Sequence, residues 1–367
     1  MATVTRRAAA VVTAASLALG LLACGTAGDD VRDEEAPRGE NLVIGLLLAD
    51  AAVTRWESFD RPLIERRIQE LCDTCAIEVS NAGNDVAVQH QQLGIMITHG
   101  VDVVIVNAVD SKSIGSAVKR ADESGIPVIA YDRLAEGPIS GYVSFDGHAV
   151  GRLQGRALLR ALGDEAANSR IVMMNGSPTD PNAGLFKEGA QAVLTDRVRI
   201  GKEFDILGWS TEGAYGAMAS AVADLGANEI DAVYAASDSI AAGAIAALRA
   251  ANVEPLPPVT GQDAELAAVQ RIVDGSQYMT VYKPYQREAF PAAEMAVALA
   301  RGETLEGIAR DHVANDTVDD IPAVYAEPIS VTAANVDEDI VRRGLFTVEE
   351  ICTPRFASAC DRAGLTG

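Results

Sequence analysis

Short apolar runs alternate with amphipathic helical patterns from Leu42 to about Tyr282, and this alternation constrains the fold more than any other feature of the chain. Strands that alternate with helices in this way predict β-α-β units and a parallel sheet. About five such units precede the segment Gly141–Asp146 and about five follow it, which indicates two similar lobes rather than one large sheet. A length of 367 residues also favours two domains. The expected fold class is therefore α/β.

The alternation ends after Tyr282. The segment Pro284–Ala300 predicts a long helix. The segment Asp311–Tyr325 is polar and less regular, and Val331–Gly344 predicts a last turn or helix.

Polar and aromatic residues follow almost every predicted strand, at the point where the strand ends. In an open α/β sheet the carboxyl ends of the strands line the ligand crevice. Residues that are far apart in the sequence should therefore converge on one site. They are Arg55, Trp56, Asp132, Arg133, Asn182, Trp209, Asp238, Asp263 and Lys283.

The chemistry of these side chains suits a neutral polyol. An ionised carboxylate such as Asp132 only accepts hydrogen bonds and a guanidinium such as Arg133 only donates them, so the two together can satisfy several hydroxyl groups. The indoles of Trp56 and Trp209, the only two tryptophans of the chain, can stack on the C–H face of a sugar ring. The alternatives are a surface ion pair at 132–133 and a tryptophan that merely covers the core.

Composition and the missing motifs exclude several classes of function. The formal net charge of −22 would repel nucleic acid and anionic lipid headgroups. The sequence contains neither a glycine-rich phosphate-binding loop nor a Gly-x-Ser-x-Gly nucleophile motif. The four histidines, His90, His99, His148 and His312, lack metal-ligand spacing. We therefore expect no cofactor and no metal site.

The N-terminus predicts export. Arg6 and Arg7 precede an apolar stretch of signal-peptide length, so residues 1–23 are interpreted as a signal peptide. The stretch ends in Leu21-Leu22-Ala23-Cys24-Gly25, which is typical of a bacterial lipobox and predicts lipidation of Cys24. Residues 24–40 then form an acidic tether. An ordinary signal peptide with a chance cysteine is the alternative.

Four further cysteines form two close pairs in the sequence. In an exported protein they predict two local disulfides, Cys72–Cys75 and Cys352–Cys360. A zinc site would need both pairs to converge, and a redox role would need a thioredoxin-like context, which the sequence does not show.

Several strings resemble the bacterial periplasmic sugar-binding proteins of the ribose, galactose and xylose type. The resemblance extends from about Leu42 to Val331. The matching strings are Arg55-Trp56, Val128-Ile129-Ala130-Tyr131-Asp132-Arg133, Ser144-Phe145-Asp146, the segment Gly176–Ala183, Gly261-Gln262-Asp263-Ala264 and Met279-Thr280-Val281-Tyr282-Lys283-Pro284.

This resemblance implies a periplasmic binding protein fold of type I, with two Rossmann-like lobes and parallel sheets. A hinge of three crossings, near residues 145–146, 283–285 and 327–330, would join the lobes. The N-terminal lobe would comprise residues 41–145 and 284–326, and the C-terminal lobe residues 146–283 and 327–367. The ligand contacts would be the strand-end residues together with Ser237. Relatives usually have Asn-Asp where this chain has Ser237-Asp238, and the region 211–215 lacks an expected second tryptophan.

The function implied is that of a monomeric, lipid-anchored receptor on the outer face of the cytoplasmic membrane. It would capture a monosaccharide, D-xylose first and another aldose such as D-glucose second, and deliver it to the permease subunits of an ABC importer. It would catalyse no reaction. The alternatives are a receptor for another small polar ligand, a secreted sugar-modifying enzyme that uses Asp132, Asp238 and Asp263, and a transcription regulator. The regulator would need a DNA-binding helix-turn-helix where this chain has an export signal.

Overall fold

The computed structural model describes residues 41–51 and 53–365. The predicted signal peptide, the lipidation at Cys24 and the tether lie outside the described residues.

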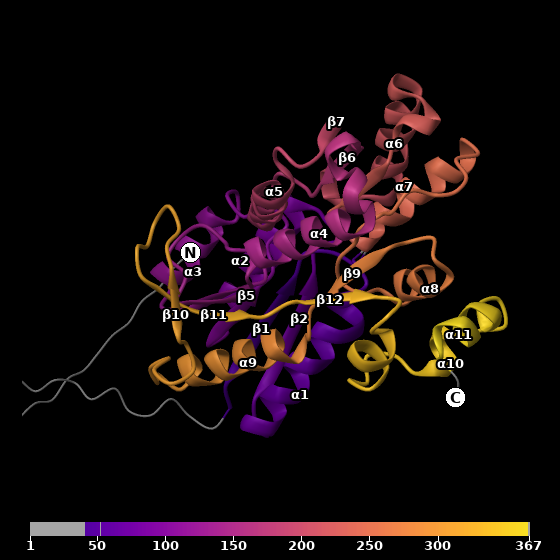
Figure 1. Ribbon diagram of the computed structural model, residues 1–367. Coiled ribbons are helices and arrows are strands. Elements are labelled where there is room, and N and C mark those ends of the chain that lie inside the picture. The colour runs from indigo at the N-terminus through magenta and orange to yellow at the C-terminus, as the bar shows by residue number, and fades with distance from the viewer. Residues whose placement is uncertain (1–40, 52, 366–367) are drawn as a thin grey trace, which may run out of the picture. The chain divides into compact units, whose positions relative to one another are not determined.

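Seven strands form the larger sheet, in the order β10-β11-β5-β4-β3-β1-β2 (Figure 1). Every neighbouring pair is parallel except the edge pair of β10 and β11. The strands are β1 (Val43–Leu48), β2 (Ala76–Asn81), β3 (Val103–Val106), β4 (Val128–Tyr131), β5 (Gly141–Phe145), β10 (Asp311–Val313) and β11 (Ile321–Ala326).

Both faces of this sheet are covered, which explains why β3 and β4 are continuous apolar runs. On one face Ile64 of α1 and Met295 of α9 pack against alternate strand residues such as Leu46. On the other face Met96 of α2 and Val118 of α3 do the same. These helices are α1 (Arg61–Leu71), α2 (Val86–His99), α3 (Gly115–Glu123) and α9 (Gln286–Ala300). The seven strands and these four helices are called the first lobe.

A second parallel sheet has the order β7-β6-β8 and shares one apolar core with four helices. Its strands are β6 (Arg170–Asn175), β7 (Arg199–Asp205) and β8 (Ala232–Ala235), and its helices are α4 (Gly147–Leu162), α5 (Pro181–Leu194), α6 (Thr211–Leu225) and α7 (Asp238–Ala250). These elements are called the second lobe. No helix in the described part of the chain is long and apolar enough to span a membrane.

The predicted strand Val259–Gln262 is an extended connection rather than a full strand. It joins β8 through a single bridge between Val233 and Val259, and the Tyr278 N–H donates to the Val259 carbonyl at 2.9 Å. Pro257 and Pro258 cannot donate to a ladder. In addition, the Thr260 hydroxyl accepts from the Ala235 N–H at 2.8 Å, in place of a backbone carbonyl.

The tail is more ordered than its sequence indicates. The segment Asp311–Tyr325, predicted to be polar and less regular, contributes the paired strands β10 and β11 to the larger sheet. The segment Val331–Gly344 contains the predicted last turn or helix, a π-helix at Asp337–Val341 that is flanked by turns. Only its first two residues belong to a strand, β12 (Ile329–Thr332), which pairs antiparallel with β9 (Met279–Tyr282). The remaining helices are α8 (Leu266–Asp274), α10 (Val348–Ile351) and α11 (Ala357–Ala363).

The chain passes three times between the two lobes, as the type I fold requires. β5 leads into α4 of the second lobe. β9, whose Met279 and Val281 belong to the core of the second lobe, leads into α9 of the first lobe, and β11 of the first lobe leads into β12, which pairs with β9. The predicted fold class is confirmed. The two predicted disulfides also form, with S–S distances of 1.95 Å for Cys72–Cys75 and 2.08 Å for Cys352–Cys360.

Candidate functional site

A cavity with about 350 Å³ of space lies at the carboxyl ends of the strands, between residues of both lobes. It is lined by Val53, Arg55, Trp56, Asp132, Arg133, Asp180, Asn182, Phe186, Trp209, Ser237, Ser239, Gln262, Asp263 and Lys283.

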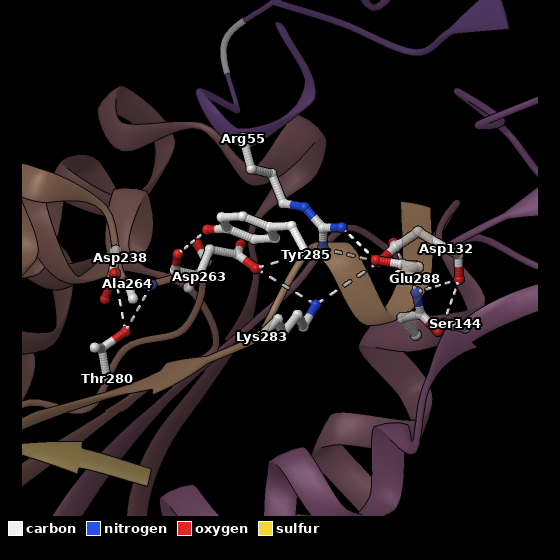
Figure 2. A network of polar contacts seen from close by, with 12 residues as sticks. Arg55, Asp132, Ser144, Asp238, Asp263, Ala264, Thr280, Lys283, Tyr285 and Glu288 are labelled. Atoms are coloured by element: carbon white, nitrogen blue, oxygen red, sulfur yellow. Dashed lines mark hydrogen bonds and ion pairs between the residues drawn. The ribbon is translucent and has the colours of Figure 1, made fainter. Parts of the chain in front are cut away.

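Arg55 is held rigidly at the cavity wall (Figure 2). Its Nε and Nη2 atoms donate to the two carboxylate oxygens of Asp60 at 2.8 Å, and Nη1 donates to Asp132 at 3.1 Å. Nη2 also donates to Glu288. Four of the five N–H donors of the guanidinium are thus engaged by carboxylates. The guanidinium lies 4.2 Å from the ring centroid of Trp56 and 4.9 Å from that of Tyr285. The fixed guanidinium can present at most one N–H to a ligand.

Asp132 joins the two lobes. Its backbone carbonyl and its Oδ1 atom accept from the Asn182 amide at 2.9 and 3.1 Å. Burial by itself raises the pKa of Asp132, but the nearby charges of Lys283 and Arg55 outweigh it, so the pKa is lowered overall. Asp132 is therefore an ionised acceptor.

A second ion pair between the lobes lies beside the first. Arg133 Nε lies 2.8 Å from Asp180 Oδ2, and Arg133 Nη1 donates to the Ala108 carbonyl at 2.8 Å. Lys283, from the crossing after β9, lies 3.4 Å from Asp263 and 3.8 Å from Asp132. The cavity wall is thus an alternating set of cations and carboxylates, almost all of them buried.

Three lining residues adopt left-handed backbone conformations: Asp132 (φ 60°), Trp209 (φ 57°) and Asp263 (φ 90°). Aspartate tolerates this region, but a bulky residue such as tryptophan does so rarely. Backbone strain of this kind is concentrated at binding and catalytic sites. It aims these three side chains at the cavity.

Several buried polar atoms at the cavity have no hydrogen-bond partner. Four of them are the indole Nε1 donors of Trp56 and Trp209 and the acceptors Gln262 Oε1 and Asp263 Oδ1. A fifth, Arg133 Nε, lies in an ion pair with Asp180, as Asp263 Oδ1 does with Lys283. Buried polar groups are nearly always satisfied, so such a set calls for a bound partner. A ligand that carries both donors and acceptors, such as a polyhydroxy compound, would satisfy all four.

Nine of the ten predicted ligand-binding residues line the cavity, and Asp238 does not. Asp238 is the first residue of α7, and its carboxylate points away from the cavity. It accepts from Gln277 at 2.7 Å and from Thr280 at 2.9 Å. Ser237 lines the cavity, but its hydroxyl also accepts from the Ile240 N–H at 3.2 Å as the N-cap of α7.

The sequence reasoning missed five lining residues: Val53, Asp180, Phe186, Ser239 and Gln262. Two of them, Asp180 and Gln262, lie within the strings that resemble the sugar-binding family, so the sequence could have indicated them. No feature of the sequence indicates the other three, Val53, Phe186 and Ser239. Among the described residues no group of three or more His, Cys, Asp or Glu side chains is arranged to hold a metal ion.

Gly176 makes room for the Trp209 indole. A Cβ atom at Gly176 would lie 2.0 Å from Trp209 Cη2, a distance that no packing allows. We expect Gly176→Ala to push the indole out of place and shift the Trp209 fluorescence towards that of a solvated indole. The spectrum is read in a Trp56→Phe background, so that Trp209 is the sole emitter. Gly184→Ala is the control, because a Cβ there meets nothing within 4 Å. Equal spectra for the two variants would contradict this packing.

Residues 44–304 match the periplasmic binding protein domain family. The chain therefore belongs to that family, as the crossings between its lobes and the cavity between them already indicate.

Named relatives extend over most of the chain. The sequence is 34% identical over 319 residues to the D-xylose-binding periplasmic protein of Haemophilus influenzae, covering 85% of this chain and 92% of the relative. It is also 34% identical to the D-xylose-binding periplasmic protein of Escherichia coli, covering 86% and 94%. A crystal structure of an ABC transporter solute-binding protein from Clostridium phytofermentans with bound β-D-glucose superposes with a TM-score of 0.78. The identity to it is 28%, covering 84% of this chain and 99% of that one.

Proposed function

We propose that this protein is a sugar receptor that binds one neutral monosaccharide in the cavity, with D-xylose the first candidate. The observation that carries the proposal is the set of unpartnered donors and acceptors between two indoles. The ring hydroxyls would donate to Gln262 and Asp263. Each of the indoles of Trp56 and Trp209 would either stack on an apolar face of the ring or donate its in-plane N–H to a hydroxyl. The similarity to two D-xylose-binding proteins supports the choice of sugar.

D-glucose is the second candidate. The solved relative from Clostridium phytofermentans holds β-D-glucose and is 28% identical to this chain. The two sugars differ by one hydroxymethyl group, which a closely fitted cavity would accept or reject by its shape.

The sugar would bring the lobes together rather than be transformed. Asp132, Asn182, Arg133 and Asp180 already link the lobes around the cavity. A ligand that contacts both lobes stabilises the closed state over the open one. We further propose that residues 41–145 and 284–326 form one lobe and that residues 146–283 and 327–367 form the other. The protein would act as a monomer, deliver the sugar to an ABC importer and catalyse no reaction.

A thermal-shift screen of monosaccharides tests the sugar assignment. A ligand that binds only the folded state raises the unfolding temperature. D-xylose, D-glucose, D-galactose and L-arabinose are compared with glycerol and a sugar acid. The largest shift should come from a neutral aldopyranose. Incubation of the same samples followed by product analysis separates a receptor from a sugar-modifying enzyme, because the receptor returns the sugar unchanged.

Lipid anchoring through Cys24 is a separate proposal, supported by the lipobox-like string at 21–25. Expressed in a bacterium that processes lipoproteins, the wild-type chain should sediment with membranes. Cys24→Ser should remain unprocessed or be released. Equal membrane association of a correctly cleaved Cys24→Ser chain would show that no lipid at this cysteine is involved.

A further inference from the structure

Glu288 is a buried carboxyl group behind the cavity that the proposed sugar site does not use directly. It lies in the first turn of α9, its side chain is fully buried, and it does not line the cavity. Its Oε2 atom accepts from Arg55 Nη2, but its Oε1 atom has no hydrogen-bond partner. A buried acceptor without a partner is costly, and this one lies among charged groups.

The charges around Glu288 do not balance. Two cations, Arg55 and Lys283, are shared by four carboxyl groups. These belong to Asp60, Asp132, Asp263 and Glu288. The phenols of Tyr131 and Tyr142 also face this group and are neutral, because burial raises the pKa of both well above the ordinary value. The ion pair of Arg67 and Glu294, where α1 meets α9, is partly exposed. A neutral sugar brings no charge. A proton retained on one carboxyl would reduce the excess.

The hydrogen bonds indicate which carboxyl holds the proton. Burial raises the pKa of Asp60 as well, against the charge of Arg55. Asp60 differs from Glu288 in that it accepts on both oxygens, from Arg55 twice and from the Tyr131 hydroxyl, so no oxygen is left for a proton. Asp132 also accepts on both oxygens, from Asn182 and Arg55. Asp263 opens onto the cavity beside Lys283. Glu288 has one oxygen that no donor faces, and this is where an O–H group fits.

The surroundings of Glu288 also favour its neutral form. Burial is the largest influence, and the negative charges of Asp132 and Asp60 add to it, so the pKa of Glu288 is raised well above its usual range despite Arg55. Asp132 lies next to Glu288 (Figure 2). Two ionised carboxylates only accept, so no hydrogen bond can join these side chains unless one of them is protonated. A proton on Glu288 Oε1 would let it donate to Asp132, and such a bond would help to lower the pKa of Asp132.

We propose that Glu288 is a neutral carboxylic acid that accepts from Arg55 and donates to Asp132, and so positions both side chains for the sugar. Glu288 is a positioning residue, because it touches no ligand itself. This inference rests on the proposed sugar-binding function, and it adds that the site holds a proton permanently.

The decisive variant is Glu288→Gln. A glutamine amide has the size of the neutral acid and repeats both hydrogen bonds, with its carbonyl facing Arg55 and its NH₂ group facing Asp132. We therefore expect the dissociation constant for D-xylose to change by less than about threefold, as measured by calorimetry. If Glu288 were ionised, the same change would remove a buried charged partner of Arg55 and weaken binding about tenfold or more. That result would overturn the proposal.

Asp60→Asn is the matched control. Asp60 is also buried against Arg55 but accepts on both oxygens, so an amide cannot replace it. We expect Asp60→Asn to weaken sugar binding about tenfold or more. Circular dichroism of both variants establishes that they are folded. If Glu288→Gln weakens binding as much as Asp60→Asn does, Glu288 is an ionised group and the proposal is wrong.

Two measurements without sugar separate this proposal from the proposed function. Infrared difference spectra of wild type against Glu288→Gln should contain the carbonyl band of a protonated carboxyl group, and its absence would refute the neutral acid.

Thermal unfolding at several pH values tests the direction in which the pKa of Glu288 is shifted. An acid whose folded-state pKa is raised loses stability as the pH rises above its unfolded-state pKa, so between about pH 5 and about pH 8 wild type should lose stability relative to Glu288→Gln. A constant difference would contradict the proposal. If the carbonyl band and the pH-dependent loss of stability are both observed but wild type binds no sugar, the proposed function is wrong and the neutral state of Glu288 is still supported.

Discussion

Arg55→Ala is expected to lower the free energy of unfolding by about 3–5 kcal/mol, because breaking a fully buried ion network leaves its carboxylates without a partner. Arg55 and its partners Asp60 and Glu288 are almost inaccessible to solvent. The guanidinium also packs between the rings of Trp56 and Tyr285, so its loss removes apolar contacts as well. Urea unfolding of the ligand-free protein measures the effect.

Arg61→Ala is the control for this prediction. Arg61 lies six residues further along the chain and also bonds to two carboxylates, Glu57 and Glu65, but its side chain is 40% exposed. Surface ion pairs of this kind contribute about 0–1 kcal/mol. Equal losses of stability in Arg55→Ala and Arg61→Ala would contradict the account of Arg55 as the centre of a buried network.

Asp263→Asn should weaken ligand binding strongly by removing a direct contact with the sugar. The unpartnered Oδ1 atom of Asp263 faces the cavity, 3.4 Å from Lys283. Loss of a charged acceptor in a desolvated site costs about 1.5–3 kcal/mol, which weakens binding about tenfold or more. Asparagine keeps the size of the side chain and tolerates the left-handed backbone at this position, whereas alanine would add strain.

The matched control is Asp311→Asn, at an exposed aspartate of β10 far along the chain. The Asp311→Asn variant should bind the sugar with the same affinity as wild type. Calorimetry with D-xylose measures both variants. Wild-type affinity in Asp263→Asn would show that this carboxylate does not contact the sugar.

The sequence allowed much of the site to be predicted, because strand ends of a parallel sheet meet at one edge. Arg55, Asp132, Asp263 and Lys283 each follow a strand or a strand-like segment, and the structure brings all four together. Asp238 follows a strand too. It begins a helix, however, and its carboxylate turns towards Gln277 and Thr280, which no strand-end rule can foresee.

Glu288 is a residue whose role could not be predicted from the sequence. In the sequence it is one acidic residue in the first turn of a long helix, where acidic residues are common and usually solvated. Only the packing of α9 against α1 and the larger sheet buries it behind Arg55. Similarly, β10 escaped prediction because it is a three-residue edge strand that is mostly exposed, and only its pairing with β11 reveals it.

Calorimetric titration of the purified wild-type protein with D-xylose is the strictest test of the proposed sugar receptor. We expect saturable binding of one sugar per chain, accompanied by a change in intrinsic fluorescence, because both indoles line the cavity. Absence of binding by D-xylose, D-glucose and the other common aldoses, under conditions where the protein is folded, would contradict it.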